Sequence, residues 1–135
     1  MNDFDLDTLR ISLHLLAACV WVGGQVVLGA LVPVLRNISP EAPRLAANRF
    51  GRVAWPFFAL VVLTGIWNLA EIEVGDRSTA YHVTLAVKLL VVAATGSAAA
   101  VHSLTGSPAI RGITGAVGLL GSIAALVFGV MLVWG

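Results

Sequence analysis

The sequence predicts an all-α integral membrane protein, a four-helix bundle that forms one domain over residues 1–135, and three observations support this prediction. First, 59% of the residues are apolar and only 11% are charged, whereas soluble domains carry about 25% charged residues. Second, four continuous apolar runs have the roughly 20 residues that a helix needs to cross a bilayer. Third, charged residues, Gly and Pro gather between the runs, as is typical of turns. The composition therefore excludes an ordinary soluble domain, and a net charge of +1 excludes a nucleic-acid-binding protein.

The four predicted spans cover about residues 9–35, 53–72, 81–104 and 113–134. Their apolar residues are continuous instead of alternating, which favours transmembrane helices over the strands of a barrel. Residues 36–52, 71–79 and 105–112 are predicted to be the connections between them.

Basic residues predict the orientation of the spans, because cytoplasmic connections are enriched in Lys and Arg. The opposite side has Arg10 and Arg77 together with most of the acidic residues. We therefore expect the first and third connections to be cytoplasmic and both termini to lie outside. Five arginines flank those two connections: Arg36, Arg44, Arg49, Arg52 and Arg111.

The first span carries a polar face at helical spacing, formed by Arg10, His14, Ala18, Trp21 and Gln25. Ionisable residues inside a span are costly and are therefore candidates for function. His14 offers an imidazole ligand, and Arg10 lies one turn away, where it can meet an anionic group. Trp21 and the small Ala18 suit a flat group bound against the helix. The alternative is a histidine that hydrogen-bonds a neighbouring helix or titrates at the headgroups.

The third span carries the most polar face of the chain, which includes Tyr81, Thr84, Lys88, Thr95 and His102. Lys88 is the one charge embedded in a span, so a solvated path or a buried site along this face is one interpretation. The other is that the lysine stem extends its ammonium group to the outer headgroups.

Three histidines are candidate metal ligands: His14, His82 and His102. Because the first and third spans run in the same direction, His14 and Lys88 are expected within roughly one turn of each other in depth. His102 lies roughly 21 Å deeper than Lys88 and cannot share a metal with His14. His82, at the outer boundary, reaches His14 only if the third helix starts irregularly.

Small residues recur every four positions on the fourth span, as in Gly121, Ala125 and Gly129, and in Gly118 and Ser122. Such spacing lets helices approach closely in lipid. It indicates either packing within the bundle or a homodimer or larger membrane complex through the fourth helix.

Two weakly polar residues of the second span, Thr64 and Asn68, lie one turn apart beside Gly65. We expect them to support a site on the outer side through hydrogen bonds.

Residues 10–24, 49–70 and 81–102 together resemble the copper resistance protein D (CopD) family of bacterial membrane proteins. The resemblance is carried by His14 followed by Trp21-Val-Gly-Gly, by Arg49-Phe50, by Thr64-Gly65 and by Lys88. It implies a location in the bacterial cytoplasmic (inner) membrane, a role in copper homeostasis and copper as a ligand. The residue chemistry adds little to this, because copper passage favours ladders of Met, Cys and His, and the chain has two Met, one Cys and three His.

The same order of residues is more distantly similar to the HemJ-type protoporphyrinogen oxidases. This second resemblance implies a functional pair of His14 and Lys88 associated with a b-type haem. Lys88, which must be neutral to ligate, or His82 would be the second axial ligand, and Arg10 and Arg77 are candidate partners of the haem propionates.

Three functions therefore stay open at the level of sequence. They are a CopD-like protein of copper homeostasis, a HemJ-like haem-b redox protein or oxidase, and a non-catalytic accessory subunit of a membrane complex. No P-loop, nucleophile–base set, zincin motif or pair of intramembrane carboxylates is present in the sequence.

Overall fold

The computed structural model describes residues 5–134, which are helical almost throughout and contain no strand. Four helical stretches within this range are long and apolar enough to cross a membrane: Leu6–Ile38, Ala42–Ala70, Thr79–Leu104 and Pro108–Trp134. The predicted all-α class and its four spans are therefore confirmed, and these helices are compatible with a membrane four-helix bundle. The chain divides between Ile72 and Glu73 into two compact units, which we call the first and second hairpins.

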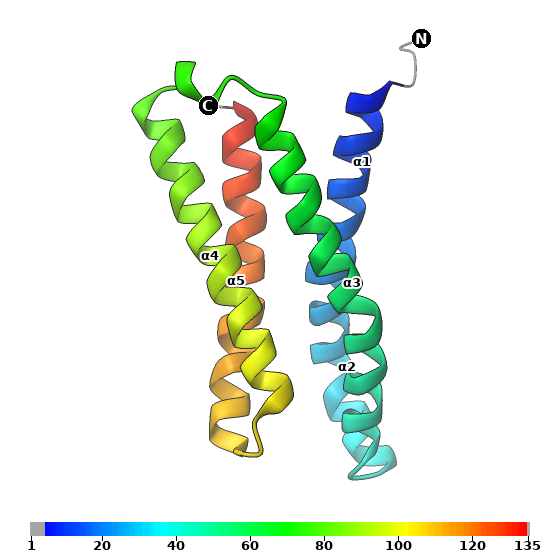
Figure 1. Ribbon diagram of the computed structural model, residues 1–135. Coiled ribbons are helices and arrows are strands. Elements are labelled where there is room, and N and C mark those ends of the chain that lie inside the picture. The colour runs from blue at the N-terminus through cyan, green and yellow to red at the C-terminus, as the bar shows by residue number, and fades with distance from the viewer. Residues whose placement is uncertain (1–4, 135) are drawn as a thin grey trace. The chain divides into compact units, whose positions relative to one another are not determined.

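The first hairpin packs a long helical stretch against one antiparallel helix (Figure 1). The stretch consists of α1 (Leu6–Ala18), the π-helical turn η1 (Cys19–Gly23) and α2 (Gly24–Ile38), and its partner is α3 (Ala42–Ala70). Asp5 caps α1, because its carboxylate accepts a 2.7 Å hydrogen bond from the Thr8 backbone N–H.

The turn η1 interrupts the regular helix in the middle of the first span. A π turn accommodates one extra residue, and the backbone carbonyls around it need other partners. Gln25 provides one, since its Nε2 donates a 3.0 Å hydrogen bond to the Trp21 carbonyl. The predicted polar face assumed a regular helix, and hydropathy gave no sign of this turn.

Helix α3 begins at Ala42, well before the predicted start of the span near residue 53. Pro43 lies in its first turn, where proline is favoured, and the Ser39 hydroxyl accepts a 3.1 Å hydrogen bond from the Ala42 N–H. The segment predicted as a connection over residues 36–52 is therefore mostly helical. The prediction was wrong there because hydropathy marks the part of a helix that suits lipid and not its ends. With 29 residues, α3 is about 44 Å long, longer than a hydrocarbon core of about 30 Å.

The second hairpin consists of the antiparallel helices α4 (Thr79–Leu104) and α5 (Pro108–Trp134), preceded by the short 3-10 turn η2 (Val74–Asp76) (Figure 1). Ser78 caps α4 by accepting a 3.1 Å hydrogen bond from the Tyr81 N–H. Pro108 stands at the first position of α5, five residues before the predicted span.

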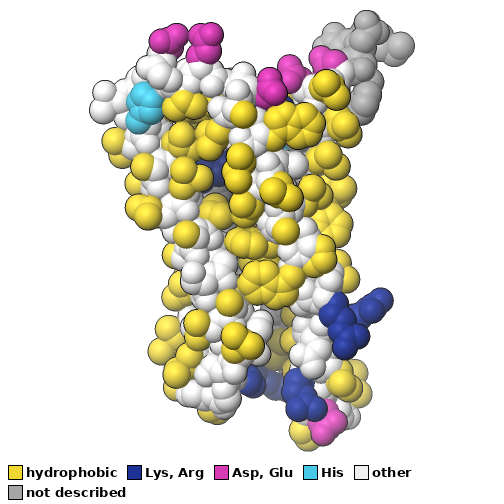
Figure 2. Space-filling view, viewed as in Figure 1, with side chains coloured by type: hydrophobic (Ala, Val, Ile, Leu, Met, Phe, Trp, Pro, Cys, Tyr) yellow, Lys and Arg dark blue, Asp and Glu magenta, His cyan; other side chains and the backbone are white. Residues whose placement is uncertain are grey.

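Large apolar side chains lie mostly on the outside, as they do in a protein solvated by lipid (Figure 2). Leu63 is 64% exposed and Leu90 is 71% exposed, whereas Ala17, Thr64, Thr95 and Ser122 are almost fully buried. Small and weakly polar residues at the contacts between helices are typical of membrane proteins. The chain is thus an integral membrane protein, and the direction in which its termini face stays a prediction.

Candidate functional site

The imidazole of His14 is held by a buried threonine of the neighbouring helix. The distance from His14 Nδ1 to Thr64 Oγ1 is 2.8 Å. Thr64 Oγ1 lies 2.7 Å from the Leu60 carbonyl, to which it donates its only proton. The threonine oxygen must therefore accept from the histidine, so Nδ1 carries a ring proton.

Gly65 lies directly beside this imidazole. A Cβ atom at position 65 would be 3.5 Å from His14 Cε1, which is ordinary van der Waals contact. The expectation that Thr64 supports a site near His14 is thus consistent with the contacts in the first hairpin. For Asn68, the described residues of this hairpin provide no hydrogen bond of the same kind.

Arg10 lies one turn before His14 on α1, and it is only 7% exposed. Its Nη2 forms a 2.9 Å ion pair with Asp7. Its Nε and Nη1 are buried and have no hydrogen-bond partner among the described residues. A buried donor without an acceptor costs about 1–3 kcal/mol, and more when it is charged. The guanidinium group therefore has an unmet requirement for an acceptor.

Trp21, a predicted cofactor-binding residue, packs inside the first hairpin and is 6% exposed. Its ring centroid is 4.5 Å from that of Phe58 and 5.6 Å from that of Trp55. This cluster was not predicted from the sequence, because contacts between helices leave no periodic signal. The cluster forms an aromatic wall next to the π turn.

Two segments that carry the family resemblance also meet in this hairpin. A Cβ atom on Gly24, the last residue of the Trp21-Val-Gly-Gly segment, would overlap the ring of Phe50 from the Arg49-Phe50 segment. Gly24 is therefore needed for the close approach of Phe50. The neighbouring Gly23 has nothing within 4 Å of such a Cβ atom.

Lys88 belongs to the second hairpin, where its side chain is half-buried and turned toward α5. Its Nζ lies 3.3 Å from the position that a Cβ atom on Gly129 would occupy. The described residues of α4 and α5 offer this ammonium group no ion pair or hydrogen bond. The predicted pairing of Lys88 with His14 involves both hairpins and stays a prediction.

The polar face of α4 packs against α5 along its length. Thr95 Oγ1 lies 2.5 Å from the Gly118 carbonyl and 2.9 Å from Ser122 Oγ. Gly121 allows this approach, because its Cβ position is 3.3 Å from the Thr95 Cβ. The recurring small residues of the fourth span thus serve packing within the hairpin. A homodimer or larger complex through α5 stays a prediction.

The other two candidate metal ligands are hydrogen-bonded to nearby backbone. His82 Nε2 lies 2.8 Å from the Val74 carbonyl, and His102 Nδ1 lies 2.8 Å from the Arg111 carbonyl. Each of these nitrogens must donate a proton to the carbonyl oxygen. Within either hairpin, the described residues contain no group of three or more His, Cys, Asp or Glu side chains placed to hold a metal ion.

Comparisons of the chain with protein-family models, with curated proteins and with solved structures find no match. The candidate site at His14 is therefore defined by the contacts within the first hairpin. The donor set around α1 is one imidazole whose Nδ1 donates to Thr64 and one guanidinium group with unmet donors. This set fits a planar, anionic metal complex such as a haem better than it fits a bare metal ion, which needs several protein ligands.

Proposed function

We propose that this chain is a membrane redox protein that binds a b-type haem through His14. The observation that carries the proposal is the hydrogen bond from His14 Nδ1 to Thr64. Ligating histidines usually donate their other ring N–H to a neighbouring group, which fixes the tautomer and orients the ring. His14 has this arrangement, with the Nε2 lone pair as the ligand. A bound haem would supply one-electron redox chemistry.

Lys88, which the HemJ resemblance pairs with His14, is our candidate for a second residue that would ligate the haem iron. An amine binds iron only when it is neutral, and charged side chains are costly inside a bilayer. The absence of an ion pair from α4 and α5 favours a role in which Lys88 carries no charge.

The test is the visible spectrum of the protein purified in mild detergent after haem has been supplied. We expect a Soret band that is lost in His14→Ala and shifted in Lys88→Met. His102→Ala is the matched control, because it removes an imidazole elsewhere in the chain. A protein that stays colourless with haem supplied, or a band that survives in His14→Ala, would contradict the proposal.

The CopD resemblance implies a copper-homeostasis function. The metal content of the same purified protein tests this alternative. Copper bound at one equivalent, with no haem, would favour it over the haem proposal. Co-purification with one partner protein and neither ligand would instead favour an accessory subunit. In all three cases we place the protein in the bacterial cytoplasmic membrane, with the N-terminal end of α1 outside.

A further inference from the structure

We infer that Arg10 binds a carboxylate of the molecule held at His14, which for a b-type haem is a propionate. This inference rests on the proposed function and adds a second contact point to it. Its basis is the state of the Arg10 side chain, which is more than nine-tenths buried while Nε and Nη1 lack acceptors. Those two nitrogens carry three of the five N–H donors of a guanidinium group.

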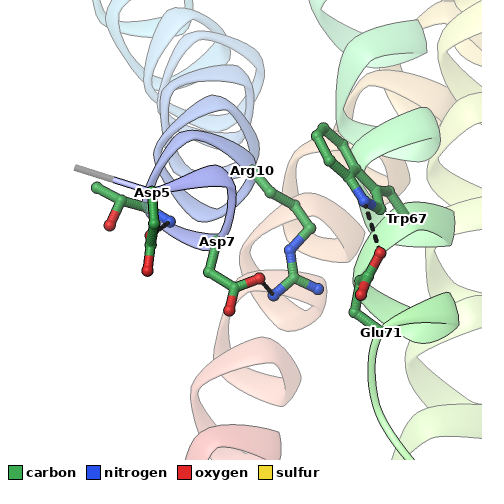
Figure 3. A network of polar contacts seen from close by, with 6 residues as sticks. Asp5, Asp7, Arg10, Trp67 and Glu71 are labelled. Atoms are coloured by element: carbon green, nitrogen blue, oxygen red, sulfur yellow. Dashed lines mark hydrogen bonds and ion pairs between the residues drawn. The ribbon is translucent and has the colours of Figure 1, made fainter. Parts of the chain in front are cut away.

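The acidic groups of the first hairpin that lie near Arg10 are already engaged. Figure 3 shows the Arg10 side chain between α1 and α3, with Asp7 on one side and the Trp67–Glu71 pair on the other. Asp7 binds only Nη2, and Glu71 Oε1 accepts a 3.2 Å hydrogen bond from Trp67 Nε1. Asp5 accepts from the Thr8 backbone. Among the described residues, Arg10 Nε and Nη1 are thus left without an acceptor.

The position of Arg10 suits binding of a carboxylate on the molecule that is held at His14. The two residues are four positions apart on α1, so they share one face and are separated by about 6 Å along the helix. A haem carries both of its carboxylates at one edge. A cation one helical turn from the histidine that holds the haem is within reach of this edge. The N-terminal end of the hairpin is also hollowed between α1 and α3, where Asp5, Leu6, Asp7, Trp67 and Glu71 line an open depression.

The test compares two ligands that differ only in their carboxylates, namely haem b and its dimethyl ester. Each is titrated into the full chain in phosphatidylcholine nanodiscs, and affinity is read from the Soret absorbance. We expect Arg10→Gln to weaken haem b binding about tenfold or more, because it removes a charge-assisted hydrogen bond. The affinity for the ester should be the same in the parent and in the variant.

Arg36→Gln is the matched control, because it also removes one cation from the first hairpin. Arg36 is exposed in the last turn of α2, at the opposite end of the first span from Arg10, so we expect both affinities to be unchanged. Arg10→Lys keeps the charge but loses the planar fork, and its haem b affinity should fall between those of the parent and Arg10→Gln. This order separates carboxylate binding from a defect in folding.

Three outcomes would overturn the inference. Arg10→Gln could bind haem b as tightly as the parent, or it could lose haem b and the ester by the same factor. The effect could also appear only in nanodiscs of the anionic lipid phosphatidylglycerol, which would assign the oxyanion to a lipid phosphate. If the parent binds neither porphyrin, the proposed function fails and this inference falls with it.

Discussion

The two hairpins are built from similar lengths of apolar helix, but they join their helices by different means. In the first hairpin, large rings fill the contact: Trp21 packs against Trp55 and Phe58. In the second, small residues bring the backbones together, and Thr95 and Ser122 both lie within hydrogen-bond distance of the Gly118 carbonyl.

This difference matters for where a ligand can bind. The Thr95 and Ser122 hydroxyls of the second hairpin form hydrogen bonds with each other and with the α5 backbone. Their role is therefore to join α4 and α5. In the first hairpin, Thr64 orients a histidine, and Arg10 keeps donors without acceptors. The polar groups of the second hairpin, apart from Lys88, therefore have structural roles. Those of the first hairpin are the candidates for binding a ligand.

The largest expected effect comes from adding one methyl group at a glycine in the helix contact of each hairpin. Gly24→Ala must displace the Phe50 ring, and overpacking of this kind costs about 1–3 kcal/mol. Gly121→Ala meets the Thr95 Cβ at 3.3 Å. A shift of a few tenths of an ångström relieves that contact, so we expect a change within about 1 kcal/mol. Unfolding in a detergent series measures both.

Gly23→Ala and Gly112→Ala are the matched controls, since neither new Cβ atom has a neighbour within 4 Å. Both should be neutral or stabilising by up to about 1 kcal/mol, the usual gain when Ala replaces Gly in a helix. A larger loss of stability for Gly121→Ala than for Gly24→Ala would contradict the conclusion that the contact at Gly24 is the tighter one.

A smaller and more selective effect comes from the same substitution in both hairpins. Thr95→Val removes a hydrogen bond between helices, and such bonds contribute about 0.6 kcal/mol on average in membrane proteins. Thr64→Val should cost a similar amount and should also remove the acceptor of His14 Nδ1. We expect only Thr64→Val to change the ring ¹⁵N shifts of His14 and, with haem bound, the Soret band.

Thr64→Ser is the control for this pair, because it keeps the hydroxyl and should restore the His14 signals. The NMR measurement needs no haem, so it tests the role of Thr64 even if the proposed function fails. Equal shifts at His14 in Thr64→Val and Thr95→Val would show that the hydroxyl of Thr64 has no special role.

The smallest effect concerns the two helix caps. The hydrogen bond from the Thr8 N–H lowers the pKa of Asp5 below its ordinary value of 3.8. Its contribution to the first turn of α1 is therefore present above pH 3.8 and lost as the pH falls through the lower, folded-state pKa. The Ser78 cap of α4 does not titrate. As the pH falls below 3.8 and through the folded-state pKa of Asp5, the protection of the Thr8 amide against hydrogen exchange should fall, and that of the Tyr81 amide should not. Parallel loss at both amides would point to global unfolding.

The number and type of helices followed from the sequence, because a bilayer imposes a simple length and hydropathy requirement. Thr64 was also expected to support a site, since a hydroxyl one turn from Asn68 on an apolar helix is conspicuous. The start of α3 was missed by eleven residues, because an arginine-rich helix outside the hydrocarbon core has no hydropathy signal. The pairing of Trp21 with Phe58 depends on how two helices face each other, and periodicity within one helix does not specify that.

The unmet donors of Arg10 could not be predicted for a related reason. A sequence shows that an arginine is near the start of a span, but not whether its acceptors are present. Only the positions of Asp7, Trp67 and Glu71 show that the neighbouring acids leave Nε and Nη1 unsatisfied.

Because of the π turn, the direction in which the side chains of the first span face depends on a single residue. Deleting one residue from Cys19–Gly23 would let the turn relax to a regular α-helix, in which each residue advances by about 100° around the axis. The part of the span before the turn would then rotate by that angle relative to α2. His14 and Arg10 would move away from Thr64 and α3 together, although neither residue had been changed.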